Sequence, residues 1–538
     1  MSDSSAPVQL PQDQVLDRRA FLERMAALSG GAATLPLIGS CATTPGVPEA
    51  NTRRASIAGI RAVALADPVE LTLSEASEVI RRRELSPLEL VDAYLSRIDR
   101  FDAVYQAFNT ILAEEARTAA RRAMDGQRGG ALHGVPIAIK DNYYTAGIRT
   151  TANSLIFQDF VPEYDATAVS RLKSAGAIVL GKTQMGPLAT TRATRPDGTV
   201  TTVNAWTPAD SSVSPGGSSS GSATAVAGRL AASSTGTQTG GSITVPSNAQ
   251  GLTGLKPTMG RVSLRGVIPL SYTRDHAGPL ARDARDAALM LQHMAGPDAA
   301  DPRTLGLPPV PDYVRAAQPV QRRGRAALRW PARIGILPEY GDGDEPADTA
   351  RAAMLKTFGE LGADLIAVEL PRDWTDLTSG SFNNVRLVER TEPFLEYLQR
   401  DVRLFGVSLS SWINGVLLDA DVYLKGQRAK LLLLQRVLDE LFAQCDVVVQ
   451  TNHVPFDMIG LPLIAFPIGM DRSRDPPRPI GAILGGLPFG EERLLSVVTA
   501  YQDVTDWHLQ RPPEPSTEPR GEASGERVRA EDVMDLAQ

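Results

Sequence analysis

The chain has 538 residues, of which 43% are hydrophobic and 22% charged, a balance typical of a globular protein with a sizeable core. Its formal net charge of −7 excludes a strongly basic surface, so no nucleic-acid partner is predicted. The two cysteines, Cys41 and Cys445, cannot form a disulfide framework, and the five histidines show no metal-ligand spacing. We therefore predict neither a metal ion nor a cofactor.

The first 41 residues predict an export signal. Paired arginines, Arg18 and Arg19, precede a mainly apolar run at 25–40 that is too short to span a bilayer. This order resembles a twin-arginine signal, which would send the protein to the periplasm. Residues 38–41 resemble a bacterial lipobox, with Cys41 as the lipidated residue that would tether the protein to a membrane. The alternatives are cleavage nearby, which gives a soluble periplasmic protein, and a short amphipathic helix.

Three further regions follow this signal. Residues 42–68 are rich in Thr, Pro, Ala and Arg and predict a linker. Residues 69–511 alternate between helical and strand patterns, which predicts an α/β architecture. Residues 512–538 are rich in Pro, Glu and Arg and predict a disordered tail.

Several elements can be placed within residues 69–511. Residues 86–89, Ser-Pro-Leu-Glu, predict a helix N-terminus with a capping box. Apolar runs at 136–139 and at 177–180, the second closed by Gly181, predict buried strands on either side of a helix at 166–175.

The first apolar run ends in a lysine. An ammonium group at the end of a buried strand must be desolvated or paired, and desolvation lowers the pKa of a lysine from about 10.4. Burial would therefore make Lys140 usable as a base at neutral pH. The alternatives are a side chain that extends to solvent and an ion pair with Asp141.

Two serines lie in glycine-rich stretches further along the chain. Ser218 follows Gly217, and Ser242 follows Gly240 and Gly241. Glycine allows unusual backbone angles and exposes N–H groups, so the second stretch could direct several donors at one oxyanion. A structural turn and a phosphate-binding loop are alternatives, although no Gly-Lys-Ser/Thr follows.

These three segments, taken in this order, resemble the amidase signature family, whose motif corresponds to residues 215–246. Further resemblances lie at 86–90, 254–258, 275–279, 460–462 and 485–489. The resemblance covers about residues 70–511. It implies one large catalytic domain, with a mixed, twisted sheet of about eleven strands covered by helices.

The resemblance also implies a Ser–Ser–Lys triad. Ser242 would be the nucleophile, Ser218 a bridging serine on a cis peptide bond after Gly217, and Lys140 the base. The backbone N–H groups of Thr239, Gly240, Gly241 and Ser242 would form the oxyanion hole. Gly217, Ser219 and Asp141 are expected to support the triad.

The sequence departs from the usual family pattern without losing a triad member. Ser220 replaces a glycine, Thr244 replaces an arginine, and Gln238 replaces an acid. Residues 184–187, Gln-Met-Gly-Pro, replace a more usual Asn-x-Ser-Glu. These departures concern the details of the pocket.

The function implied is hydrolysis of a small-molecule amide at its carbon–nitrogen bond, through an acyl-enzyme on Ser242. The products would be a carboxylic acid and ammonia or an amine. One alternative is a protein resembling the ammonia-releasing component of a glutamine amidotransferase, and another is a catalytically silent lipoprotein that binds ligands. Residues 217–221 also match the Gly-x-Ser-x-Gly pattern of α/β-hydrolases, with Ser219 as nucleophile.

Substrate selection is expected to involve residues 380–430, which carry no readable motif. The large apolar residues of this region are expected to be core rather than pocket. They are Phe382, Phe394, Trp412 and Leu417.

Overall fold

A computed structural model describes residues 66–126 and 129–516 of the chain. They contain one mixed sheet of eleven strands, in the order β1-β3-β2-β4-β6-β5-β12-β13-β11-β9-β10. The strands are β1 Phe108–Ile111, β2 Pro136–Lys140, β3 Ile178–Thr183, β4 Ser234–Gln238, β5 Thr253–Lys256, β6 His276–Ala281, β9 Arg333–Ile336, β10 Asp364–Ala367, β11 Val447–Gln450, β12 Leu463–Asp471 and β13 Arg478–Gly486. A separate hairpin pairs β7 Gln321–Arg322 with β8 Arg325–Ala326. The predicted sheet is confirmed.

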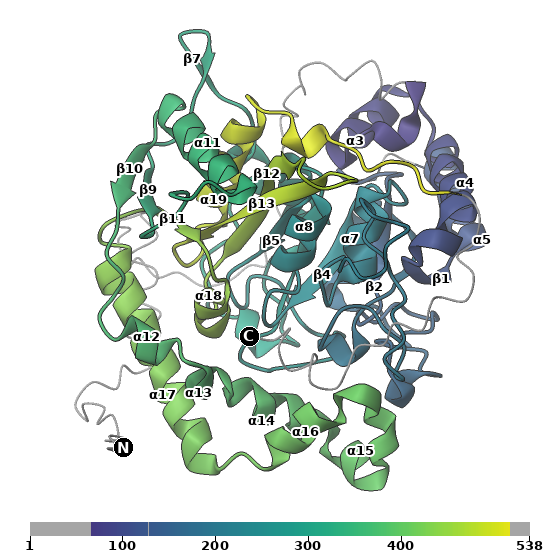
Figure 1. Cartoon of the computed structure of the whole chain (residues 1–538). Coiled ribbons are helices and arrows are strands. Elements are labelled where there is room, and N and C mark those ends of the chain that lie inside the picture. Colours follow the sequence, from purple (N-terminus) through teal and green to yellow (C-terminus); the bar gives the residue numbers. More distant parts are fainter. Residues whose placement is uncertain (1–65, 127–128, 517–538) are drawn as a thin grey trace, which may run out of the picture. The chain divides into compact units, whose positions relative to one another are not determined.

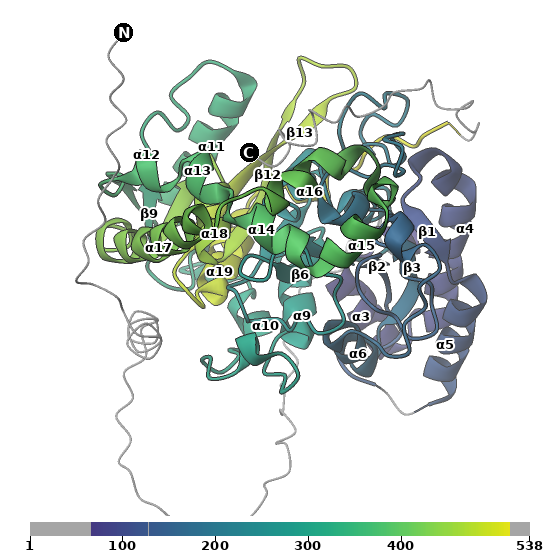
Figure 2. The ribbon, with the colours of Figure 1, turned by 90° about the horizontal axis from the view of Figure 1, so that it is seen from below.

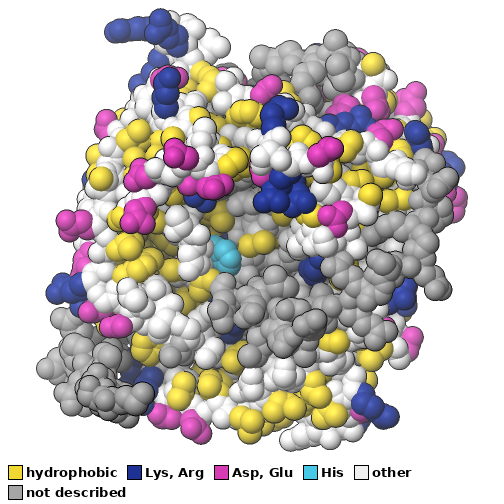
Figure 3. Space-filling model, viewed as in Figure 1, with side chains coloured by type: hydrophobic (Ala, Val, Ile, Leu, Met, Phe, Trp, Pro, Cys, Tyr) yellow, Lys and Arg dark blue, Asp and Glu magenta, His cyan; other side chains and the backbone are white. Residues whose placement is uncertain are grey.

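Helices cover this sheet and form a further layer beyond one end of it, where α12 to α17 lie (Figures 1 and 2). The α-helices are α3 Leu73–Arg82, α4 Pro87–Tyr105, α5 Ala113–Asp125, α6 Thr167–Ser174, α7 Ser220–Ala227, α8 Thr244–Gln250, α9 Ala284–Met294, α10 Tyr313–Ala316, α11 Pro346–Glu360, α12 Trp374–Leu377, α13 Gly380–Asn383, α14 Val385–Thr391, α15 Leu395–Arg400, α16 Leu409–Val416, α17 Ala420–Arg436, α18 Val454–Ile459 and α19 Glu491–Gln502. In the space-filling view, basic, acidic and hydrophobic side chains are interspersed on the face shown (Figure 3).

Local sequence signals explain several of these boundaries. Ser86 caps α4 through a capping box with Glu89, as predicted. The predicted strands at 136–139 and 177–180 correspond to β2 and β3. Gly181 does not close β3, which continues to Thr183, because β1 and β2 pair with it on both sides.

The sheet and its covering helices enclose the main core, and a smaller core lies under α15 and α16. Phe394 and Trp412 belong to this smaller core, with exposed fractions of 2% and 0%, as expected. Leu417 is instead a surface residue, because 72% of it is exposed at the end of α16.

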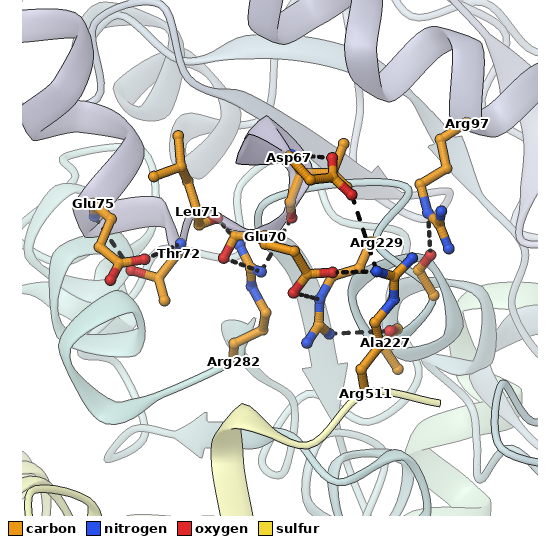
Figure 4. A network of polar contacts seen from close by, with 12 residues as sticks. Asp67, Glu70, Leu71, Thr72, Glu75, Arg97, Ala227, Arg229, Arg282 and Arg511 are labelled. Atoms are coloured by element: carbon orange, nitrogen blue, oxygen red, sulfur yellow. Dashed lines mark hydrogen bonds and ion pairs between the residues drawn. The ribbon is translucent and has the colours of Figure 1, made fainter. Parts of the chain in front are cut away.

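Charged side chains, all buried except the half-buried Arg511, fasten the start of the described chain to the sheet region in a group that we call the anchor network (Figure 4). The network consists of Glu70, Arg229, Arg282 and Arg511. Arg229 Nε donates to Glu70 Oε2 at 3.3 Å, and Arg511 forms an ion pair with Glu70 Oε1 at 2.9 Å. Arg282 donates to the backbone carbonyls of Val69, Glu70 and Leu71. Each arginine therefore has protein acceptors.

The predicted export signal at 1–41, with Cys41, lies outside the described residues. Most of the predicted linker and tail lies outside them as well. Among the helices that are described, none is both long and apolar enough to cross a bilayer.

Candidate active site

Lys140 is the last residue of β2, and its side chain is fully buried. Because β2 and β4 run parallel, their carboxyl ends reach the same edge of the sheet, which brings Lys140 next to Thr237. Lys140 Nζ lies 2.9 Å from Ser218 Oγ and 2.8 Å from Thr237 Oγ1. Burial holds the pKa of Lys140 well below its usual value, while the charge of Asp275 opposes this shift. The amine can therefore be neutral and act as a base.

Two oxygens of Thr237 can accept the N–H groups of a neutral Lys140, so that its lone pair is available to Ser218. A neutral lysine has two N–H donors and one lone pair. Thr237 Oγ1 can accept one N–H, and the Thr237 carbonyl oxygen, 3.5 Å from Nζ, can accept the other. Ser218 Oγ is then the neighbour that faces the lone pair.

Asp141 does not pair with Lys140, so that alternative is excluded in this structure. Adjacent residues at the end of a strand point to opposite faces. Asp141 Oδ1 instead lies 3.2 Å from Lys182 Nζ, and Asp141 Oδ2 accepts hydrogen bonds from Thr151 and Asn109. In the described part of the chain, no carboxylate lies within 4.0 Å of Lys140 Nζ. Asp141 therefore takes up Lys182 and leaves Lys140 without a counterion.

The loop before α7 holds Ser218, which is 1% exposed. The peptide bond between Gly217 and Ser218 is cis, as the resemblance implied. A Cβ atom on Gly217 would lie 2.6 Å from the Thr191 carbonyl oxygen, so only glycine fits there. Ser218 O accepts a hydrogen bond from Gly186 N at 3.1 Å. These contacts fix the Ser218 backbone beside Lys140.

Ser219 and Ser220 support this loop rather than the chemistry. Ser219 Oγ donates to Thr237 O at 3.4 Å, and Ser219 is fully buried. No strand directly precedes it in the structure, so the α/β-hydrolase alternative lacks its required strand. Ser220 Oγ donates to Gly216 O at 2.6 Å, which explains how a serine is accommodated in place of glycine.

Ser242 lies in the loop that joins β4 to α8. It is 7% exposed, more than Lys140 or Ser218, which agrees with the role of nucleophile that the resemblance implies. The loop of Ser218 contacts α8, the helix that follows Ser242, because a Cβ atom on Gly216 would lie 2.4 Å from Pro246 Cα. In the described residues, however, no hydrogen bond joins Ser242 to Ser218 or Lys140. The structure thus brings Lys140 and Ser218 into direct contact and holds the Ser242 loop beside them.

The glycine loop presents fewer free N–H donors than the sequence predicts. Gly241 N donates to Asp457 Oδ2 at 2.9 Å, so this donor is occupied. The N–H groups of Thr239, Gly240 and Ser242 donate no hydrogen bond to another described residue. Three of the four predicted donors therefore stay available for an oxyanion.

Asp457, on α18, is a site residue that the sequence did not reveal. Its carboxylate accepts hydrogen bonds from Gln238 Nε2 at 2.7 Å and from Gly241 N, and His453 Nδ1 lies 2.8 Å from it. Burial acts to raise the pKa of Asp457, but the contact with His453 and the charge of Lys256, 3.5 Å away, hold it far below its usual value. Asp457 thus places a negative charge beside the loop that carries Gly241 and Ser242.

Gln238 links this carboxylate to the start of α8. Its Oε1 accepts hydrogen bonds from Ile243 N at 2.8 Å and Thr244 N at 2.9 Å. A neutral amide at 238 can donate to Asp457, whereas an acid there would place two carboxylates together. The departure at Gln238 is therefore matched by Asp457, and the Thr244 hydroxyl donates to Gln238 Oε1 at 3.3 Å.

The described residues contain no group of three or more His, Cys, Asp or Glu side chains arranged to hold a metal ion. A hydroxyl relay with a neutral amine can activate a serine without one.

Comparisons with known proteins agree with this architecture. The family model Amidase matches residues 89–451, so the chain belongs to the amidase family. The A subunit of the glutamyl-tRNA(Gln) amidotransferase of Geotalea daltonii is 33% identical over 502 residues, which cover 82% of this chain and 99% of that protein. The corresponding protein of Roseiflexus sp. is 35% identical and covers 82% of this chain and 98% of that protein.

Solved structures give the same family. The native peptide amidase from Stenotrophomonas maltophilia is 29% identical, with a TM-score of 0.71 and coverage of 83% of this chain and 98% of that one. An amidase family protein from Bacillus anthracis is 26% identical, with a TM-score of 0.71 and coverage of 85% and 96%. The family and the fold support a carbon–nitrogen amidase type of reaction.

Proposed function

We propose that this protein hydrolyses linear amides at the carbon–nitrogen bond through an acyl-enzyme on Ser242. One observation carries the proposal: Lys140 is fully buried, without a counterion, and 2.9 Å from Ser218 Oγ. A buried amine without a counterion destabilises a fold, so its retention beside a serine favours a chemical role.

The proposed reaction moves protons along Ser242, Ser218 and Lys140. Lys140 accepts the Ser218 proton while Ser218 accepts the Ser242 proton, and Ser242 Oγ then bonds to the amide carbonyl carbon. The N–H groups of Thr239, Gly240 and Ser242 stabilise the oxyanion. Ser218 then returns a proton to the leaving nitrogen as the carbon–nitrogen bond breaks, and Lys140 reprotonates Ser218. Water attacks the ester by the reverse relay and releases the acid.

The missing hydrogen bond between Ser218 and Ser242 is compatible with this relay. Catalytic hydrogen bonds are often long in a free enzyme and shorten when substrate binds. The Ser242 side chain lies in a loop between two glycines and α8, where one rotamer change can reorient it.

Labelling with a fluorophosphonate tests the proposal directly. Wild-type protein should be labelled and should hydrolyse members of a panel of aliphatic, aryl and peptide-terminal amides. Ser242→Ala should abolish labelling and lower turnover by about 10⁴-fold or more. Ser233→Ala is the matched control, because Ser233 is also buried but immediately precedes the opposite end of β4. A folded wild-type protein without labelling or turnover would instead favour a silent binding module.

A component of an amidotransferase is the second candidate, because the curated relatives named above carry that name. Such a component would release ammonia from glutamine for use by partner proteins. Full turnover of simple amides by the isolated chain, without preference for glutamine, supports the amidase. Activity on glutamine that appears only with partner proteins would overturn it.

We also propose that residues 1–41 export the protein to the periplasm and that Cys41 is lipidated. The paired arginines and the lipobox-like 38–41 support this. A reporter fused to residues 1–45 should reach the periplasm of a twin-arginine-competent host. Retention in the cytosol would overturn the export proposal, and a periplasmic Cys41→Ser protein with unchanged membrane attachment would overturn lipidation.

A further inference from the structure

Four cationic side chains gather between the nucleophile loop and the helical layer, and we call them the arginine cluster. Arg274 precedes β6, Arg386 and Arg390 lie on α14, and Lys430 lies on α17. The three arginines are 1%, 8% and 4% exposed, respectively. Buried guanidinium groups normally have carboxylate or carbonyl partners, so this group requires an explanation.

Arg274 is under-partnered. Its Nη1 donates to Asn383 at the end of α13. Its Nε and Nη2 are buried and have no hydrogen-bond partner among the described residues. Within those residues no carboxylate lies within 4.0 Å of its nitrogens.

Arg390 is in a similar position. Its Nη1 donates to Ser411 Oγ at 2.9 Å, while its Nε is buried without a partner in the described chain. Its guanidinium carbon lies 5.8 Å from the centre of the Trp412 ring. Neither contact supplies a negative charge.

The nearest carboxylates are already occupied. Glu389 accepts hydrogen bonds from Ser271 Oγ at 2.5 Å, Thr273 N at 3.0 Å and Gln427 Nε2 at 2.8 Å. Asp275 accepts from Thr239 Oγ1 at 2.5 Å and from Leu270 N at 2.7 Å. Both acids hold loops together and cannot also chelate the arginines.

The arginines of the cluster also repel one another. Burial, and then the neighbouring charges of Arg274 and Arg390, lower the pKa of Arg386 to about 8. Burial and the charge of Arg274 lower the pKa of Arg390 to about 10. An anion placed among these groups would relieve both the desolvation and the mutual repulsion.

The cluster reaches the proposed reaction centre through Arg274. A Cβ atom built on Gly240 would have one neighbour within 4 Å, which is Arg274 Nη2 at 3.9 Å. Gly240 is partly exposed and precedes Ser242 by two residues. The space beside Gly240 is thus open and ends at an unpartnered guanidinium nitrogen.

We propose that Arg274, supported by Arg390, binds a carboxylate of the substrate, so that the preferred amides are anionic. The carboxylate lies a few bonds from the scissile carbonyl, because Arg274 approaches the loop of Ser242 itself. Arg274 and Arg390 keep buried N–H groups without acceptors in the described chain because the substrate supplies the missing anion. This inference rests on the proposed amidase function and names its substrate class.

Matched pairs of amides test the proposal, since each pair differs only in exchanging a methyl group for a carboxylate. Malonamate, succinamate and glutaramate are compared with propionamide, butyramide and pentanamide for a charge on the acyl side. N-butyrylglycine is compared with N-ethylbutyramide for a charge on the leaving side. One anionic member should exceed its neutral partner in kcat/KM by about 10²- to 10³-fold. The side on which this occurs identifies the position of the carboxylate.

Arg274→Met should abolish this preference, and Arg274→Lys should retain part of it. The preference is the ratio of the two kcat/KM values, which a uniform loss of folded enzyme does not change. Arg274→Met should also raise Tm, because it removes a buried charge that has no carboxylate within 4.0 Å in the described chain and two nitrogens without acceptors. Arg229→Met, in the anchor network, is the matched control: it should lower Tm and leave the ratio as in wild type.

Two failures are distinguishable. A protein that is labelled by fluorophosphonate but hydrolyses both members of every pair equally retains the proposed function and overturns the anionic substrate. A protein without labelling or turnover overturns the proposed function itself. An unchanged ratio in Arg274→Met would also overturn the role of Arg274, whatever its Tm.

Discussion

Two groups of cations in this protein differ in the acceptors that surround them. In the anchor network, Arg229 and Arg511 share Glu70, and Arg282 donates to backbone carbonyls (Figure 4). In the arginine cluster, Arg274 keeps two nitrogens without partners in the described chain. Lys140 resembles the second group, because it has hydroxyl neighbours and, among the described residues, no carboxylate.

This difference in hydrogen-bond acceptors indicates which cations stabilise the fold and which are available for a chemical role. A buried charge with well-placed acceptors can be neutral or favourable for folding, whereas one without them lowers the free energy of unfolding. In the anchor network, carboxylate and carbonyl oxygens accept hydrogen bonds from the arginines. Near the Ser242 loop, Arg274 and Lys140 have no carboxylate within 4.0 Å in the described chain. An amine without a counterion can stay neutral and accept a proton, and guanidinium N–H groups without acceptors can bind an anion, so the proposed reaction needs both features near Ser242.

Replacing Lys140 should have the largest effect on activity. Lys140→Met should lower kcat/KM by about 10³- to 10⁴-fold, because Ser218 loses its base. It should also raise Tm, because the buried amine is removed. The wild-type acid limb of the pH profile should follow protonation of Lys140, so activity falls as pH decreases.

The stability gain should depend on pH in a defined direction. The pKa of Lys140 is lowered on folding, so its burial penalises the folded state below the unfolded value of 10.5. The difference in Tm between Lys140→Met and wild type should therefore grow as pH falls and disappear near that value. Normal turnover in Lys140→Met would contradict the role of Lys140 as a base, and a lower Tm would contradict the expected cost of burying its amine.

The anchor network should show the reverse behaviour. Arg229→Met should lower the free energy of unfolding by about 3 kcal/mol, because it leaves Glu70 buried with fewer partners. Turnover per folded molecule should not change. Chemical denaturation and active-site titration measure these two quantities. If Arg229→Met raised the free energy of unfolding, as Arg274→Met is expected to do, the presence of acceptors would not explain the difference between the anchor network and the arginine cluster.

Replacing Asp457, whose carboxylate lies beside the Ser242 loop, should have a smaller effect that a second substitution partly restores. Asp457→Asn should lower kcat/KM by about 10²-fold, because the new amide faces the donors Gln238 Nε2 and Gly241 N. Gln238→Glu with Asp457→Asn should restore part of this loss, because the exchange again pairs an acceptor with a donor. If the loss of kcat/KM in the double variant equalled the combined losses of Gln238→Glu and Asp457→Asn, position 457 would require a negative charge.

Parts of this site could be predicted because their signals are local. Lys140 ends an apolar strand, and both serines follow glycines, so the candidate residues are visible within a few positions, but their triad roles came only from the resemblance to the amidase signature family. Alternating strand and helix patterns predicted the α/β class, and the same resemblance implied the eleven-stranded sheet. The caps and short strands were placed to within two or three residues.

Other parts depend on contacts between distant segments. Asp457 meets Gly241 across 216 positions of the chain, and Asn383 meets Arg274 across 109. No periodicity encodes such a meeting. Asp141 shows the same limit, because its choice of Lys182 over Lys140 follows from the pairing of β2 with β3.

The smallest expected effect concerns the hydroxyl that orients Lys140. Thr237→Val keeps the shape of β4 but removes the Oγ1 that accepts from Nζ, so an N–H of the amine turns toward Ser218 more often. The kcat/KM should fall by about 10-fold. Thr237→Ser keeps the hydroxyl and is the control, so it should stay within about 2-fold of wild type. Equal losses in both variants would mean that packing of the methyl group matters, and that the acceptors around Lys140 do not direct its lone pair.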